Sequence, residues 1–201
     1  MGGSVQPSTF QPSTNPQTFP QVQQPQMPML PTSPQLTTAN SNCIEADAQT
    51  CEIEMHIFQL TNQLRSSGAT SVSFISFIFP KIYPPKPAFI YDGKIAWLAR
   101  YWSMAQGTRK TLSHEGFENG QHDVIYRNKF GSTPRIVAEN VAMFNFGPSM
   151  MNPQEIAQQL FAQWRSSDGH LKSMMGSFQT IGIGVYKTPG GSYYATQIFG
   201  D

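Results

Sequence analysis

Two histidines and one glutamate are the side chains in this sequence best placed to carry chemistry. His114 and His170 both lie in polar, turn-like segments, whereas Glu139 stands inside an apolar stretch at 136–144. A carboxylate buried in such a stretch needs a partner, because desolvating an unpaired charge is costly. Two imidazoles that converge on it would supply that partner, and the same trio completed by water occurs at zinc sites. We therefore expect His114, Glu139 and His170 to form a site for zinc or another divalent cation.

Two further interpretations of these side chains stay open. The trio could be a buried polar network that fixes strands and helices without an ion, which explains the residues as well as a weak metal site does. Ser166 and Ser167, close to His170, would outline a Ser-His-Glu hydrolase together with Glu139. However, the sequence has no strained nucleophile turn or oxyanion loop, so catalysis is the less supported interpretation. Asn140 is expected to bond the backbone of the core.

Composition divides the chain at about residue 44. Residues 1–44 contain no charged side chain, eight prolines and eight glutamines. Such a segment cannot bury enough apolar surface to offset the entropy of ordering its backbone. All Lys, Arg, Asp and Glu residues fall in 45–201, a length typical of one domain. The sequence therefore predicts a disordered tail at 1–44, which could bind a partner protein, and one folded domain at 45–201.

Charge and hydropathy exclude several kinds of partner. A net charge of +1 with scattered Lys and Arg gives no basic patch for nucleic acid. No apolar run reaches the roughly 20 residues that a transmembrane helix needs. The first residues lack the basic and apolar regions of a secretory signal, so we expect an intracellular protein. In that setting Cys43 and Cys51 are expected to be free thiols.

The elements that must position these residues are a mixture of helices and strands. Apolar residues at helical spacing predict helices at about 50–65, 92–107, 124–129 and from 153 onward, each with a cap or a glycine stop. Strands are predicted at 136–144 and in a hairpin over 181–199, where Gly182 and Gly184 leave one face bare for a close neighbour. The apolar run at 72–79, closed by Pro80, predicts an edge strand or extended loop. This order predicts an α+β layered domain with an antiparallel sheet.

Several segments, in a fixed order and at fixed spacings, carry a family resemblance. They are 61–65, 99–105, 113–114, 138–140, Trp164 with 167–170, 181–185 and 193–200. Together they resemble the CAP superfamily, also called SCP-like or pathogenesis-related-1-like domains, in its short, bacterial-type branch. The resemblance covers residues 57–200 and none of the tail.

This resemblance implies a three-layer alpha-beta-alpha sandwich with a central antiparallel sheet and a cleft that holds two His and two Glu. His114 and His170 match the two histidines, and Glu139 matches the first glutamate. The residues expected around the cleft are Asn140, Ser167 and Trp164. Ser167 stands where many members have the second glutamate, so we expect a metal to bind with low affinity.

The function implied by the resemblance is non-catalytic binding of a lipid or sterol, or of a protein partner. Lipid binding in the family has been linked to loops and grooves around the helices, which gives Phe74, Phe77 and Phe79 as a lipid or partner loop. The alternatives are a metal- or serine-dependent hydrolase and a structural interaction protein that acts through its tail. Because family members are commonly secreted, secretion is the alternative to an intracellular location.

Overall fold

The computed structural model of the chain describes residues 43–71, 80–115, 120–145 and 151–201. The chain divides into two units, residues 1–37 and 38–201, and all of the described residues belong to the second. The apolar run at 72–79, with Phe74, Phe77 and Phe79, lies outside the described residues, as does the predicted tail up to residue 42. The domain boundary at residue 44 therefore stays a prediction.

A four-stranded sheet with the order β3-β5-β6-β4 forms the centre of the domain. The strands β5 (Thr180–Lys187) and β6 (Tyr193–Gly200) form the predicted antiparallel hairpin, and β4 (Ile136–Phe144) pairs antiparallel with β6. The short β3 (Ile90–Tyr91) adds a parallel pair on the other side of β5, which the sequence pattern did not indicate. Every residue of β6 is buried, because the strand lies inside the sheet and is covered by helices.

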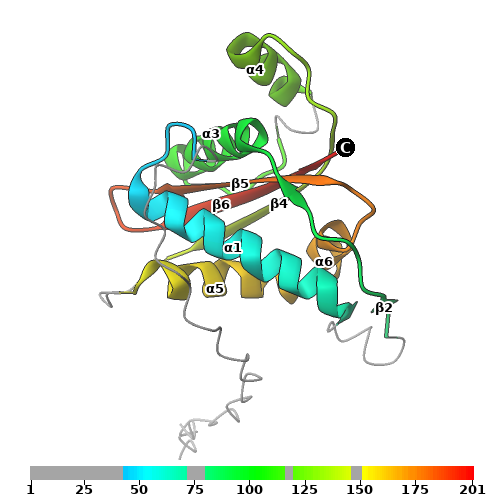
Figure 1. The fold of residues 1–201 in the computed structure, drawn as a ribbon. Coiled ribbons are helices and arrows are strands. Elements are labelled where there is room, and N and C mark those ends of the chain that lie inside the picture. Colours follow the sequence, from blue (N-terminus) through cyan, green and yellow to red (C-terminus); the bar gives the residue numbers. More distant parts are fainter. Residues whose placement is uncertain (1–42, 72–79, 116–119, 146–150) are drawn as a thin grey trace, which may run out of the picture. The chain divides into compact units, whose positions relative to one another are not determined.

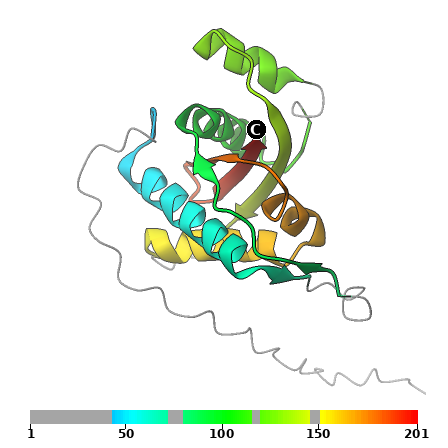
Figure 2. The same cartoon turned by 45° about the vertical axis from the view of Figure 1, so that its right-hand side comes forward.

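Helices lie on both faces of this sheet, which confirms the α+β class and the three-layer alpha-beta-alpha sandwich (Figure 1). α3 (Gly93–Arg109) covers one face, whereas α1 (Ala48–Ser67), α5 (Pro153–Arg165) and α6 (Asp168–Met174) cover the other. α1 and α5 run side by side, as the turned view in Figure 2 also shows. α4 (Gln121–Phe130) packs on α3 through the buried ring of Tyr126.

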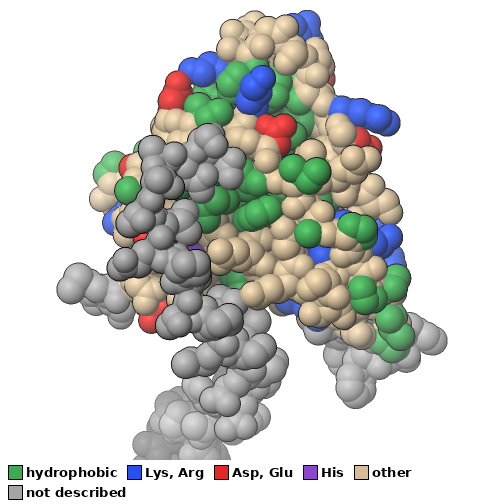
Figure 3. Space-filling view, viewed as in Figure 1, with side chains coloured by type: hydrophobic (Ala, Val, Ile, Leu, Met, Phe, Trp, Pro, Cys, Tyr) green, Lys and Arg blue, Asp and Glu red, His purple; other side chains and the backbone are tan. Residues whose placement is uncertain are grey.

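Three further features describe the surface of the domain. β1 (Ala69–Thr70) and β2 (Ile82–Tyr83) form an antiparallel pair that flanks residues 72–79. On the face drawn in Figure 3, acidic and basic side chains are interspersed, in keeping with the net charge of +1. No helix in the described part of the chain has the length and apolar character needed to cross a membrane.

The helix starts follow the capping chemistry of the sequence. Asp92 accepts hydrogen bonds from the amides of Lys94 and Ile95 at the start of α3. Asn152 and Glu155 form a reciprocal capping box at the start of α5. Both caps satisfy backbone N–H groups that have no partner within the first helical turn. The predicted starts of these two helices are therefore confirmed.

The predicted stop of α3 at Gly107 is wrong, because the helix continues to Arg109. A Cβ atom at position 107 would lie 2.7 Å from the ring of Tyr186, so the glycine makes room for that ring. The helix instead ends at Lys110, which adopts the left-handed conformation with φ of 55°. Gly107 thus serves packing rather than termination.

Two glycines let α3 lie against β5 at backbone distance, as their bare face predicted. A Cβ on Gly182 would overlap the backbone at 95–96, and a Cβ on Gly184 would overlap the backbone at 99–100. Any side chain larger than hydrogen would therefore push the helix off the sheet. These two positions fix how closely α3 approaches β5.

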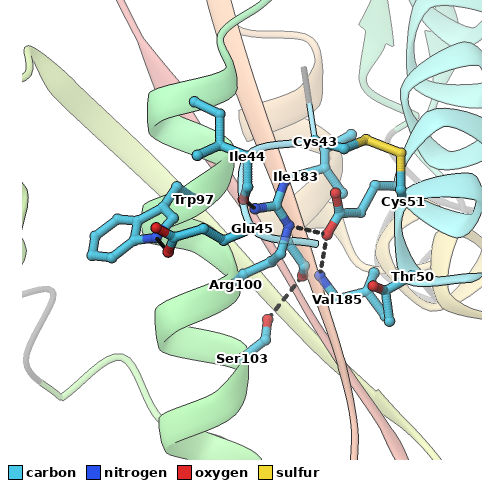
Figure 4. Close-up of polar contacts among 12 residues, drawn as sticks. Cys43, Ile44, Glu45, Thr50, Cys51, Trp97, Arg100, Ser103, Ile183 and Val185 are labelled. Atoms are coloured by element: carbon cyan, nitrogen blue, oxygen red, sulfur yellow. Dashed lines mark hydrogen bonds and ion pairs between the residues drawn. A yellow bond between two sulfur atoms is a disulfide. The ribbon is translucent and has the colours of Figure 1, made fainter. Parts of the chain in front are cut away.

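Residues 43–47, here called the strap, hold the start of α1 against α3 (Figure 4). Cys43 forms a disulfide with Cys51, with Cα atoms 5.7 Å apart, so the prediction of two free thiols is wrong. The physical reason is a local turn, in which Ala46 N donates to Cys43 O (3.2 Å) and brings Cys43 back beside the helix. Asp47 then caps α1 by accepting from Thr50 N (3.0 Å).

The strap also contacts α3 and α4. The backbone oxygen of Ile44 accepts a hydrogen bond from Arg100 Nη1. Glu45 Oε2 accepts from Trp97 Nε1 (2.7 Å; Figure 4). Glu45 Oε1 lies 2.6 Å from Lys129 Nζ. Since Arg100 and Trp97 belong to α3 and Lys129 to α4, the strap joins three helices.

Beside the strap, Glu54 of α1 and Arg100 of α3 form an ion pair. Arg100 Nε lies 2.6 Å from Glu54 Oε1, and the Glu54 side chain is completely buried. The amide of Val185 (2.9 Å) and the hydroxyl of Tyr91 (3.5 Å) also donate to this carboxylate. Burial raises the pKa of Glu54 to about 7, although Arg100 and the Val185 amide act in the opposite direction.

Candidate functional site

The loop that carries His114 is anchored at the end of α3 by Gln106. The Gln106 side chain accepts a hydrogen bond from Ser113 N (3.2 Å), and its backbone oxygen accepts from Thr111 N (3.1 Å). The Nε2 group of Gln106 donates in turn to Thr196 Oγ1 in β6 (3.5 Å). Because Gln106 is buried and joins the sheet to this loop, it sets where His114 lies.

The structure brings His114 and Glu139 into contact. His114 Nδ1 lies 2.8 Å from Glu139 Oε2. The Glu139 side chain is 2% exposed, whereas the His114 side chain is 45% exposed. The loop after α3 and the middle of β4 thus place a solvent-accessible imidazole against a buried carboxylate.

His170 lies in α6, near enough to His114 for the two charges to interact. Burial and, to a smaller degree, the charge of His114 lower the pKa of His170, so its ring is neutral at neutral pH. His170 Nδ1 is buried and has no hydrogen-bond partner among the residues that the structure describes. A buried ring nitrogen of this kind still needs a partner, which a ligand can supply.

Asn140 belongs to the core beside the site. Its Nδ2 group donates to the backbone oxygen of His170 (3.1 Å) and to Gln197 Oε1 (2.9 Å). Gln197 Nε2 continues the chain by donating to Thr61 Oγ1 (3.0 Å). Because Asn140, Gln197 and Thr61 are fully buried, these bonds hold α6 and α1 onto the sheet.

Ser167 and Trp164 have structural roles in the helices next to the site. Trp164 is fully buried in α5. Ser167 is the N-cap of α6, and its backbone oxygen accepts from Leu171 N (2.8 Å). Ser166 Oγ donates to Gln163 O (2.9 Å) rather than to an imidazole. The arrangement of these hydroxyls gives no support to the serine hydrolase interpretation.

Of the three candidate ligands, His114 and Glu139 are in contact, and His170 lies near them. Across 43–71, 80–115, 120–145 and 151–201, no group of three His, Cys, Asp or Glu side chains is arranged to hold a metal ion. Glu139 engages His114 Nδ1, which leaves the Nε2 nitrogen of that ring, and His170 has its unpaired Nδ1. Imidazole nitrogens backed by a carboxylate are a donor set that suits zinc, so the residue types fit the ion even though they are not closed around one point.

Sequence reasoning missed two buried polar residues of the helices, Gln106, which anchors the His114 loop, and Glu54, which pairs with Arg100. Gln106 lies one helical turn after Trp102 on the buried side of α3, and Glu54 lies beside Ile53 on the buried side of α1. A polar residue within the apolar stripe of a helix must find a hydrogen-bond partner, and this was the signal that could have found both.

The chain matches one family model and several solved structures. The model described as CAP: Cysteine-rich secretory protein family matches residues 58–199. No protein among the curated ones matches the chain. NaASP2 in its crystal structure with Zn2+ is 15% identical, with a TM-score of 0.51 over 79% of this chain and 83% of that one. Na-ASP-1 is also 15% identical, with a TM-score of 0.51 over 84% of this chain and 43% of its own. An outer surface protein of Borrelia burgdorferi is 14% identical, with a TM-score of 0.47 over 76% of this chain and 94% of its own.

Proposed function

Because the chain belongs to the CAP family, the Cysteine-rich secretory protein family, we propose that it is a non-catalytic binding protein. The ligand site in this proposal is the cluster of His114, Glu139 and His170. The observation that supports it most is the 2.8 Å contact between His114 and Glu139 beside an unpaired nitrogen of His170. A partly exposed cluster with an unsatisfied member suits a ligand better than a closed structural network, in which every polar group is paired.

A divalent cation, zinc first, is the ligand we propose for this cluster. His114 and His170 would hold the ion, and Glu139 would orient the ring of His114. The lowered pKa of His170 favours the neutral ring, which is the form that binds a metal. NaASP2, which shares the fold, has a crystal structure with Zn2+. When bound, the ion would supply a positive charge that attracts an anionic group of a ligand.

Zinc affinity is expected to fall at least about tenfold when His114 and His170 are both replaced by Ala, because both imidazole donors are lost. Calorimetric titration of the metal-free full chain with zinc chloride measures the change. The matched control replaces His56 and His122, which lie on α1 and α4, by Ala. Equal zinc affinity in the two double variants would exclude the cluster as the metal site.

Besides the metal ion, we propose that the chain binds a lipid or sterol, or a protein, in line with the family resemblance. The tail at 1–44 is the segment we propose for contact with a protein, because its prolines and aromatic residues suit an extended docking segment. The serine at position 167, in place of a second glutamate, supports weak rather than tight metal binding at the site.

We also propose that the chain works in an oxidising compartment, such as the outside of the cell. The support is the disulfide between Cys43 and Cys51, since such bonds persist in oxidising compartments and are rare in the cytosol. Protein taken from its native cells and alkylated without reductant is expected to carry no label on either cysteine. Intact-mass measurement checks this, and labelling of both thiols would contradict the proposal.

A further inference from the structure

A concave site lies apart from the contact between His114 and Glu139. It is a pocket of about 260 Å³ formed by the strap, the first turn of α1, one side of α3 and strand β5. None of the three residues of the proposed metal cluster lines it. We call it the strap pocket, and its lining includes Glu45, Asp47, Trp97, Arg100, Tyr101 and Tyr186.

Aromatic rings supply much of the wall of the strap pocket. Trp97 and Tyr101 of α3 are stacked, with ring centroids 6.1 Å apart and an interplanar angle of 27°, and Tyr186 adds a ring from β5. The faces of such rings attract cations through their quadrupole. The chain already uses Trp97 in this way, because Lys129 Nζ lies 5.2 Å from the centroid of its ring.

The charges around the strap pocket leave a negative balance. Arg100 is paired with Glu54 at 2.6 Å, and Glu45 is paired with Lys129 at 2.6 Å. Above the Glu54 pKa of about 7, where this carboxylate is ionised, both pairs are close to neutral overall. The carboxylate of Asp47, which also lines the pocket, adds a negative charge that neither pair offsets. An anion would therefore be repelled, and a cation attracted.

We propose that the strap pocket binds a small organic cation of the quaternary ammonium class. The methyl groups of such a cation contact ring faces, and a nearby carboxylate balances its charge although the cation has no N–H to donate. The volume of about 260 Å³ lies just below the usual range for ligand sites, so the group must be small. The same group occurs free in choline and on the headgroup of phosphatidylcholine, and the test includes both sources.

The disulfide is part of this site because the strap forms one of its walls. Glu45 and Asp47 belong to the strap, and the bond between Cys43 and Cys51 fixes the strap to α1. Replacing both cysteines by Ser is expected to loosen that wall and to weaken cation binding, while the rings of α3 stay in place.

The test follows the indole N–H signals of the ¹⁵N-labelled full chain in NMR spectra during a titration with choline chloride. The chain has three tryptophans, and only Trp97 lines the pocket, whereas Trp102 and Trp164 are buried in the core. Choline is expected to shift the Trp97 signal saturably, with a dissociation constant on the order of millimolar, and to leave the other two in place. The neutral isostere 3,3-dimethylbutan-1-ol is expected to shift it far less.

Two matched variants test whether the negative charge of Asp47 contributes to choline binding. Asp47→Asn removes a negative charge but keeps a residue that caps helices well, and it is expected to weaken choline binding about fivefold. Asp92→Asn makes the same change at the N-cap of α3, outside the pocket lining, and is expected to leave choline affinity unchanged.

Three results would overturn the proposal. They are a Trp97 signal that moves neither with choline nor with phosphatidylcholine vesicles, an equal shift with the neutral alcohol, and unchanged affinity in Asp47→Asn. A shift with free choline supports a soluble cation as the ligand. A shift with vesicles and none with choline supports the same ammonium group carried by a lipid headgroup.

Discussion

Replacing Arg100 by Leu is expected to lower the free energy of unfolding by about 3 kcal/mol near pH 8. Arg100 Nε lies 2.6 Å from the completely buried carboxylate of Glu54. Without the guanidinium, this carboxylate must either stay charged and unpaired or take up a proton, and both are costly at that pH. The strap also loses the donor to the backbone oxygen of Ile44. Urea unfolding of the two proteins measures the difference.

The pH dependence of this loss separates the ion pair from ordinary packing. In the wild-type chain the pKa of Glu54 is raised from 4.5 to about 7, so the folded form holds the proton more tightly than the unfolded form. The contribution of Glu54 to the free energy of unfolding therefore falls as the pH rises from about 4.5 to about 7, and is level above that. Without Arg100 the pKa of Glu54 rises further, so the fall continues above pH 7. The loss is expected to be on the order of 1 kcal/mol larger near pH 8 than near pH 6.

Arg135→Leu is the matched control, because Arg135 pairs with Asp201 at 3.9 Å and its side chain is 79% exposed. Exposed pairs contribute little to stability, so this variant is expected to unfold almost as the wild type does at both pH values. A loss in Arg100→Leu that stayed the same from about pH 6 to about pH 9 would contradict the assigned role of Glu54.

Replacing Gly184 by Ala is expected to cost about 3 kcal/mol or more, or to prevent folding. The added Cβ would overlap the backbone at 99–100 of α3, and a backbone cannot turn aside as a side chain can. α3 would have to move off β5, and Gln106, which anchors the His114 loop, would move with it. Thermal unfolding is expected to show a melting temperature lower by about 10 °C.

Gly190→Ala supplies the comparison in the same hairpin. Gly190 lies in the turn between β5 and β6, and the nearest atom to a Cβ there is Thr188 Oγ1 at 3.9 Å. This variant is expected to melt within a few degrees of the wild type. If Gly184→Ala melted at the same temperature as Gly190→Ala, the close backbone contact between α3 and β5 would be refuted.

Much of this fold follows from local patterns in the sequence. The capping residues Asp92 and Asn152 give the starts of two helices, and the glycines at 182 and 184 indicate a bare strand face with a close neighbour, which the structure identifies as α3. The end of α3 was not predictable, because a glycine that stops a helix and one that admits a neighbouring ring look the same in one sequence. The neighbour that decides it at Gly107 is Tyr186, which reaches it only through tertiary packing.

The site was predictable only in part, for related reasons. A carboxylate within an apolar strand showed that Glu139 needs a partner, but the loop position of His114 depends on the anchor at Gln106, whose side chain bonds are non-local. The prediction for Cys43 and Cys51 was wrong for a different reason. Their separation of eight residues allows a bond through a local turn, whereas the expectation of free thiols was drawn from the compartment.

α3 bears residues of both proposed sites, since Trp97 and Tyr101 line the strap pocket and Gln106 anchors the His114 loop. The backbone of α3 lies so close to Gly182 and Gly184 of β5 that an added Cβ would overlap it, so we expect the helix to have little freedom to shift on the sheet. We therefore expect α3 to have no second position that a ligand at one end of the helix could favour. Allosteric coupling between the two sites would require two such positions. Occupancy of either site is thus expected to leave the other thermodynamically uncoupled, so that two independent ligands can be carried at once.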